Sequence, residues 1–217
     1  MPKFVDAALR RQEVVEAVFR IVAADGLERA SLREVADEAD LAVGSVRHYF
    51  ASSDELLAHS FGVVVDRIAG RLDAAEAALA ETAPGSAEHR RGVLTLLGEL
   101  LPLDEERAVD ACVWMAFKNA ARTRPFLAAE ADRSHRTVAA VVGRLMMDLA
   151  AVDGGSTAGG TDNIGQQQLV TEAERLLATL DGLTMHALLQ PEWMTAQMSH
   201  DVLDAHLASL GGRIASH

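Results

Sequence analysis

The sequence predicts an all-α protein, and three observations lead to this fold class. Proline is rare, with 5 in 217 residues. Apolar residues recur every three or four positions along most of the chain, which is the period of an amphipathic helix. The few runs of β-branched residues keep the same helical spacing. We therefore expect an N-terminal three-helix domain over residues 1–51 and a larger helical domain over residues 52–217.

The segment SLREVADEADLAVGSVRHYF, residues 31–50, predicts two short helices joined by a tight turn. One apolar stripe precedes the turn and another follows it: Leu32, Val35, Ala36 and Ala39, then Val43, Val46 and Phe50. The outer side of the second helix presents small and hydrogen-bonding residues: Gly44, Ser45, Arg47 and His48. Such a helix suits the DNA major groove, where base edges and phosphates offer acceptors. A helix-turn-helix is therefore favoured, and an ordinary helical hairpin in a core is the alternative.

Two capping patterns mark where helices begin around this segment. Ser31 with Glu34 predicts the start of the first helix, and Ser52 with Glu55 predicts the start of another helix directly after the motif. In each pair the serine oxygen can accept from the amide three residues on, and the glutamate can reach back to the N-cap amide.

Residues 14–61 resemble the N-terminal domain of the TetR family of bacterial transcriptional regulators. The resemblance rests on a first helix (EVVEAVFRIVAADGLERAS), a second (LREVADEA), a third (AVGSVRHYF), and SSDELL opening a fourth. It implies that the third helix reads the major groove, while the N-termini of the second and fourth helices contact the DNA backbone or nearby bases. The residues that match these roles are Ser31, Arg33, Ser45, Arg47, His48, Tyr49 and Ser53.

Three positions depart from the family's pattern. Asp40 stands in the turn where glycine is usual, and aspartate is among the few other residues that tolerate a left-handed backbone. Ala42 stands at the N-cap of the third helix, so one amide lacks a side-chain partner. Ser53 replaces a lysine that commonly contacts phosphate. A hydroxyl and the helix N-terminal amides can still bind phosphate there, with a weaker and less salt-dependent contact.

The net charge is unusual for a DNA-binding protein. The whole chain has a net charge of −12, and residues 1–60 hold seven Lys/Arg against eleven Asp/Glu, which gives 7 − 11 = −4. Composition alone would argue against nucleic acid. We infer few phosphate contacts, modest non-specific affinity and dependence on two DNA-binding heads acting together.

The rest of the chain predicts further helices and one linker. Helices are expected over residues 53–80, 87–101, 104–122, 125–151, 166–189 and 195–210, and the glycine- and serine-rich residues 153–162 are expected to be a mobile loop. The last two helices carry an apolar stripe: Leu169, Ala173, Leu176, Leu180, Leu183 and Ala187, continued by Met198, Val202 and Leu210. Periodicity cannot tell whether this stripe completes a monomer core or packs against a second copy. The TetR resemblance favours a homodimer.

The C-terminal region also resembles the BetI-type branch of the family, through ELLPLDEER at residues 99–107 and LDGLTMHALLQPEWM at residues 180–194. That branch senses small molecules, with choline as the founding case. Choline itself is not expected here, because an aromatic cage is usual for a quaternary ammonium and only 4% of this chain is aromatic. A mostly apolar pocket is predicted around Trp114, Met115, Phe117, Lys118, Met146, Met147, Met185 and His186. For each methionine alone, core packing is the alternative.

Enzyme and metal chemistry find little support in the sequence. The single cysteine, Cys112, lies in an apolar helical run, and the eight histidines show no HExxH arrangement. No cofactor is predicted, and no apolar segment is long enough to cross a bilayer, so a cytoplasmic protein is expected. The predicted function is a ligand-responsive regulator, a repressor that binds a palindromic double-stranded DNA operator as a homodimer. The alternative is a helical interaction protein that kept the fold but lost operator binding.

Overall fold

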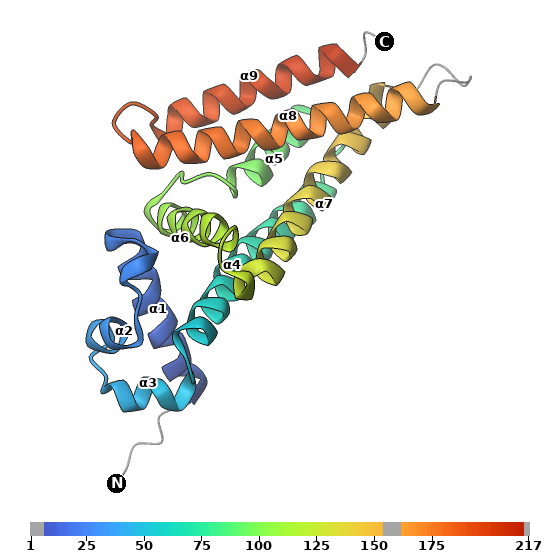
Figure 1. Ribbon diagram of the computed structural model, residues 1–217. Helices are drawn as coiled ribbons and strands as arrows, with labels where there is room; N and C mark the ends of the chain where they lie inside the picture. The colour runs from blue at the N-terminus through green and yellow to red at the C-terminus, as the bar shows by residue number, and fades with distance from the viewer. Residues whose placement is uncertain (1–6, 154–161, 215–217) are drawn as a thin grey trace. The chain divides into compact units, whose positions relative to one another are not determined.

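The computed structural model describes residues 7–153 and 162–214, and within them the chain is helical with no strand (Figure 1). The elements in chain order are α1 (Ala7–Asp25), η1 (Leu27–Arg29), α2 (Leu32–Glu38), α3 (Val43–Tyr49), α4 (Ser53–Ala80), α5 (Ala87–Gly98), α6 (Glu105–Ala121), η2 (Pro125–Leu127), α7 (Ala128–Asp153), α8 (Asp162–Leu189) and α9 (Ala196–Ile214). The all-α prediction is confirmed. No helix of the described ranges is long and apolar enough to cross a membrane.

Most predicted helix limits agree with the structure to within a few residues. The helix predicted over residues 53–80 has these limits in the structure. The helix predicted over residues 125–151 is instead a short 3-10 turn, η2, followed by α7. Pro125 lies at the start of η2, where a missing amide is tolerated. The helix α8 begins at Asp162, four residues before its predicted start. The interior of the predicted linker, residues 154–161, lies outside the described residues.

The chain divides into two compact units. The first comprises Met1–Arg67 and Val109–Ser134, and the second comprises Ile68–Ala108 and His135–His217. Helices α4, α6 and α7 each contribute residues to both units. The sequence-based division after residue 51 separates the predicted DNA-binding helices from the rest of the chain, whereas these two units are defined by internal packing. The division at residue 51 stays a prediction.

The first unit has a core built on α1. Val14, Val18 and Phe19 are buried on this helix, and contacts with α2, which in turn contacts α3, complete the three-helix head. Beyond the head, Phe61 of α4 stacks on Phe117 of α6, with ring centroids 5.1 Å apart. These buried rings fix the start of α4 against α6 within this unit.

An ionic cluster also joins three helices of the first unit. Arg67 of α4 binds Glu16 of α1 and Asp110 of α6, and its guanidinium lies 4.8 Å from the centre of the Phe19 ring. Asp110 is 1% exposed, so this contact with Arg67 lies in the interior of the unit.

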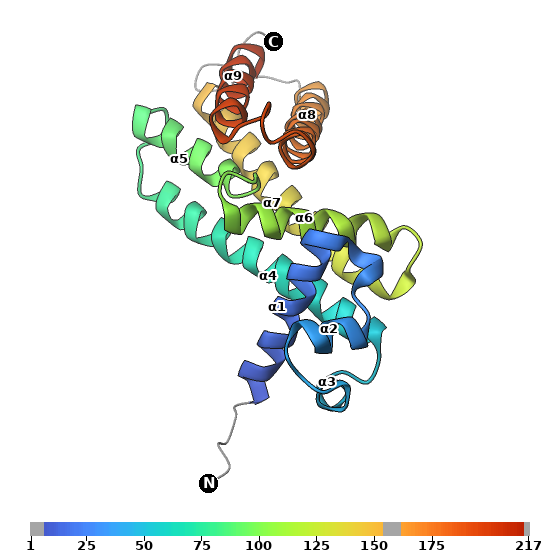
Figure 2. The ribbon, with the colours of Figure 1, turned by 90° about the vertical axis from the view of Figure 1, so that its left-hand side faces the viewer.

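The second unit has a leucine-rich core shared by α5, α7, α8 and α9. Leu97, Val142 and Leu176 are fully buried in it. Helices α8 and α9 run side by side, as both ribbon views show (Figures 1 and 2). The apolar stripe predicted on α8 therefore serves the core of the single chain, because Leu176, Leu180 and Leu183 are all buried there. Met198 and Val202 differ from them, since both are exposed.

Candidate functional site

The recognition helix α3 has one buried and one exposed side. Val46 and the following Phe50 are completely buried, which anchors the helix to the head. Ser45, Arg47 and His48 are exposed on the other side. Tyr49 is half-buried, and its ring meets the His48 ring edge-on at 5.2 Å. At Gly44 an added Cβ would meet nothing within 4 Å, so the exposed side also offers space for close approach.

The turn before α3 has a defined geometry. Asp40 has a φ of 53°, as the sequence suggested for a residue in glycine's place. The Asp40 amide donates to Asp37 O over 3.2 Å, and the Leu41 amide donates to Ala36 O over 2.9 Å. These two bonds form the Schellman motif that commonly ends a helix. The turn therefore sets the entry of the chain into α3 through backbone bonds.

Capping differs among the three helices that are predicted to touch DNA. Ser31 Oγ accepts from the Glu34 amide, and Ser52 Oγ accepts from the Glu55 amide. The Glu55 carboxylate reaches back to the Ala51 amide at 2.8 Å, one residue before the N-cap. By contrast, Ala42 at the N-cap of α3 provides no side-chain hydrogen bond. Helices α2 and α4 thus have fixed N-termini, while α3 depends on its buried side and on the turn.

Half of the arginines in the described part of the head form ion pairs. Within the described residues, Arg10 binds Glu13, Arg20 binds Glu38, and Arg29 lies 3.6 Å from Glu34. Each pair compensates one carboxylate of the head, and it also engages the arginine that forms it. Among the described residues, Arg33 on α2 and Arg47 on α3 are exposed and form no ion pair. Two open arginines per head agree with the expectation of few phosphate contacts.

The Phe50 ring has the basic side chains of Arg11 and His59 as neighbours. The Arg11 guanidinium is 4.8 Å from the Phe50 ring centre, and the His59 ring is 5.4 Å from it. Partial burial, and secondly the Arg11 charge, lower the pKa of His59, while Asp66 and Glu55 oppose this shift. The three side chains connect α1, the end of α3 and α4.

The residues predicted to bind a ligand do not share one environment. Trp114, Met115, Phe117 and Lys118 belong to the first unit, whereas Met146, Met147, Met185 and His186 belong to the second. Lys118 Nζ lies 5.3 Å from the Trp114 ring centre, and Trp114 Nε1 donates to Ser134 Oγ over 2.7 Å.

Burial divides the same set further. Phe117 and Met146 are buried in cores, while Met147 and Met185 are 60% and 51% exposed. The ligand site built from these residues stays a prediction.

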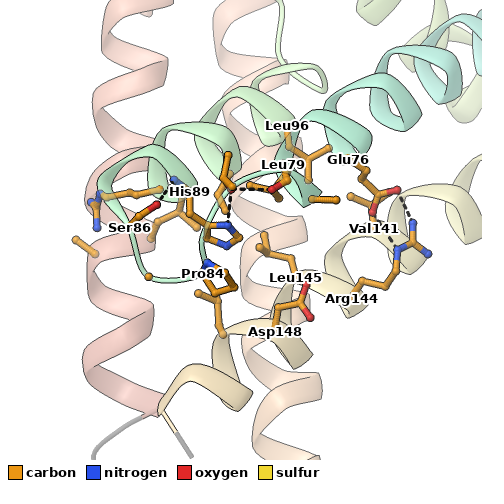
Figure 3. A pocket seen from close by; sticks show the side chains of 18 residues that line it. Glu76, Leu79, Pro84, Ser86, His89, Leu96, Val141, Arg144, Leu145 and Asp148 are labelled. Atoms are coloured by element: carbon orange, nitrogen blue, oxygen red, sulfur yellow. Dashed lines mark hydrogen bonds and ion pairs between the residues drawn. The ribbon is translucent and has the colours of Figure 1, made fainter.

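The second unit contains a cavity of about 670 Å³ that none of those eight residues lines (Figure 3). Its walls come from the end of α4, the loop into α5, the first turns of α5, the second half of α7, and α9. The lining residues are Glu76, Leu79, Ala80, Thr82, Pro84, Gly85, Ser86, His89, Arg90, Val93, Leu96, Val141, Arg144, Leu145, Asp148, Leu149, Leu207 and Ala208. Sequence reasoning missed this site because its parts are far apart in the chain. The only local signal among the lining residues is Pro84-Gly85, which predicts the end of a helix but does not indicate a binding site.

Comparisons with known proteins agree on one family. Residues 14–59 match the model of bacterial regulatory proteins of the tetR family, and residues 89–212 match that of the BetI-type transcriptional repressor C-terminal domain. The HTH-type transcriptional regulator PksA of Bacillus subtilis is 32% identical over 210 residues, covering 97% of this chain and 94% of PksA.

Solved structures give the same result. A transcriptional regulator from Rhodococcus sp. Rha1 superposes with a TM-score of 0.73 at 30% identity, covering 92% of this chain and 94% of that one. The multidrug binding protein EbrR complexed with imidazole gives a TM-score of 0.57 at 27% identity, covering 91% and 94% of the two chains. PksA and the Rhodococcus protein are named as transcriptional regulators, and both matching family models describe regulators rather than enzymes. The chain is a TetR-family transcriptional regulator with a BetI-type C-terminal domain.

Proposed function

We propose that this regulator is a repressor that binds a palindromic operator as a homodimer and releases it when a small molecule binds. The observation that carries the proposal is the exposed side of α3. Ser45, Arg47 and His48 lie opposite the buried Val46, and Arg47 has no ion pair among the described residues. A free guanidinium on such a helix can pair with guanine or phosphate. A regulator acting on the chromosome would work in the cytoplasm.

The other proposed DNA contacts follow from the ends of α2 and α4. Ser31 and Arg33 are exposed at the start of α2, and Ser53 is the first residue of α4. We assign these residues to the DNA backbone, where helix N-terminal amides assist phosphate binding. Asp54 and Glu55 lie in the first turn of α4 and oppose an anion there, so the Ser53 contact should be weak.

Exposed apolar side chains on the last two helices support the homodimer. Eight large apolar residues are exposed in the described ranges, and six of them lie on α8, α9 or the turn between them: Val170, Met185, Leu189, Trp193, Met198 and Val202. Such a concentration is typical of an interaction surface. A two-fold dimer would place two recognition helices on the two half-sites of a palindrome.

The effector step rests on the family and on the continuity of α4. The related EbrR is a multidrug binding protein whose crystal structure contains imidazole, which supports a small-molecule response in this chain. Helix α4 begins beside the recognition helix at Ser53 and continues to Ala80 in the second unit. A ligand that shifts this helix needs a coupling of only about 1–3 kcal/mol to release the operator appreciably.

The test is selection of DNA from a random duplex library, followed by footprinting of the enriched sequence. We expect a short palindrome, protected on both half-sites. Arg47→Ala should then weaken operator binding by roughly 1–3 kcal/mol, the range for loss of an arginine–guanine pair. Arg136→Ala, which removes an exposed arginine from α7, is the matched control and should bind as the unaltered protein does. If no sequence is enriched, the chain is better described as an interaction protein that has lost operator binding.

A further inference from the structure

The cavity of the second unit has a polar side whose hydrogen-bonding character can be assigned. The Thr82 hydroxyl donates its only proton to Leu79 O over 2.6 Å, so it must accept in its 2.9 Å contact with His89 Nδ1. The Nδ1 atom therefore carries the imidazole proton. In the neutral ring, Nε2 is then an acceptor. Figure 3 shows the ring amid the lining, between Pro84 and Leu145.

Both arginines of the lining are already engaged by carboxylates. Arg144 forms a two-pronged pair with Glu76, with N–O distances of 2.9 and 2.7 Å. Arg90 binds Asp204 at 2.7 Å. The charge of each guanidinium is therefore already compensated by a carboxylate, which disfavours an anionic ligand. Asp148 is different, since it is exposed and forms no ion pair among the described residues, although, after the Glu76 hydrogen bonds, its charge also helps to raise the pKa of the Arg144 guanidinium four residues earlier.

The remaining wall is aliphatic. Leu79, Val93, Leu96, Val141 and Leu145 cover the space between α4, α5 and α7. Helices α4 and α5 approach each other closely beside this wall. This is seen at Gly92 of α5, where an added Cβ would lie only 2.7 Å from Leu79 Cδ1 of α4. The lining holds no Phe, Tyr or Trp. A cation without N–H groups, which relies on aromatic faces, would gain little from such a wall.

From these contacts we infer that the cavity between α4, α5, α7 and α9 binds an amphipathic amine, with its aliphatic body on the leucine-rich wall and its ammonium N–H groups donating to Asp148 and His89 Nε2. Charge-assisted hydrogen bonds of this kind are stronger than neutral ones. Its lining includes none of the eight residues of the ligand site predicted from the sequence. Its regulatory meaning rests on the proposed function, whereas the binding itself does not.

The test is calorimetric titration of the full-length protein with decylamine, without DNA, at about pH 8, where an alkylamine is protonated and a neutral imidazole is usual. We expect saturable binding at one site per chain. Decyltrimethylammonium, which has the same charge and no N–H, should bind at least about tenfold more weakly, because it cannot make the charge-assisted bonds. Decanoate should not bind. Equal binding of all three compounds, or tighter binding of decanoate, would overturn the inference.

Two variants with matched controls localise the site. Ala80→Trp fills the cavity from an exposed position on α4 and should abolish decylamine binding, whereas Ala78→Trp, exposed on the same helix outside the lining, should not. Asp148→Asn should weaken binding by roughly three- to tenfold through loss of the charge-assisted contact. Asp132→Asn, exposed on the same helix, should leave it unchanged. Binding that survives both cavity variants would place decylamine elsewhere and refute this site.

The same titrations separate this inference from the proposed function. If the protein selects an operator but does not bind decylamine, the amine site is refuted and the proposed function as a DNA-binding regulator stands. A protein that binds decylamine in the expected order but selects no DNA confirms the site and refutes operator binding.

Discussion

Asp40 holds a left-handed backbone conformation at the end of α2, with a φ of 53°. A non-glycine residue there carries strain of about 1 kcal/mol, which glycine would not. We therefore expect Asp40→Gly to raise the free energy of unfolding by roughly 0.5 kcal/mol, after part of the gain is offset by greater freedom in the unfolded chain. Urea denaturation followed by circular dichroism measures this change.

The control for that prediction lies three residues earlier. Asp37 is helical and exposed within α2, so Asp37→Gly should lower the free energy of unfolding by about 1 kcal/mol. If both variants destabilise the protein equally, the turn at Asp40 is not strained in solution.

His59 should make stability depend on pH. Its pKa lies below the ordinary value of 6.5, mainly because of partial burial and then because of Arg11. As the pH falls through this region, the unfolded chain takes up a proton before the native chain does. The free energy of unfolding should therefore decrease, since the unfolded state binds more protons. His59→Gln should reduce this decrease between about pH 7.5 and 5.5. An unchanged pH dependence in denaturation series of the two proteins would show that His59 is not responsible.

At the scale of the elements, local signals predicted the helices well. The capping serines at 31 and 52, and proline at residue 125, act on atoms a few positions away, so the sequence contains their whole cause. The starts of α2 and α4 could be placed for this reason. Local sequence signals could not predict which other helix, if any, packs against each apolar helix face. Leu176 and Met198 look alike in a periodic pattern, yet one is buried in the core and the other is exposed.

The sites show the same difference. The proposed DNA contacts come from one contiguous segment, so a family pattern can locate them. The cavity is lined by both His89 of α5 and Asp148 of α7, which are 59 positions apart and reach the same space only through tertiary packing. The predicted methionine pocket stays a prediction for a related reason, because adaptable apolar residues suit cores, pockets and surfaces alike.

The recognition helix itself lacks one stabilising group. Ala42 has the extended conformation of an N-cap, with φ −68° and ψ 141°, but no side-chain oxygen to accept from α3. Ala42→Ser should add that bond and raise the free energy of unfolding by about 0.5–1 kcal/mol. A fixed N-terminus should also order α3 before it meets DNA, so operator affinity should not fall. Thermal unfolding and gel-shift titration of the same preparation check both effects. A lower melting temperature would mean that the serine cannot reach the α3 amides.

At the scale of the whole molecule, the last two helices have two distinct apolar faces. The inner face holds Leu176 and Leu183 and completes the core of the single chain. A charge there would unfold the second unit, so such variants cannot report on assembly. The outer face holds Met185, Leu189, Met198 and Val202, which are exposed in the single chain. A dimer test must therefore alter the outer face alone.

Met185→Glu should convert the proposed homodimer to a folded monomer. The added carboxylate would be buried without a counterion if α8 packs against a second copy, and it would be solvated in a monomer. Analytical ultracentrifugation should show half the mass of the unaltered protein, with an unchanged far-ultraviolet circular dichroism spectrum. Leu9→Glu, which places the same charge at an exposed leucine of α1, is the control and should remain dimeric. Operator binding should fall with Met185→Glu because one head makes few phosphate contacts and a palindrome needs two. A dimer that persists in Met185→Glu would place the interface away from this part of α8.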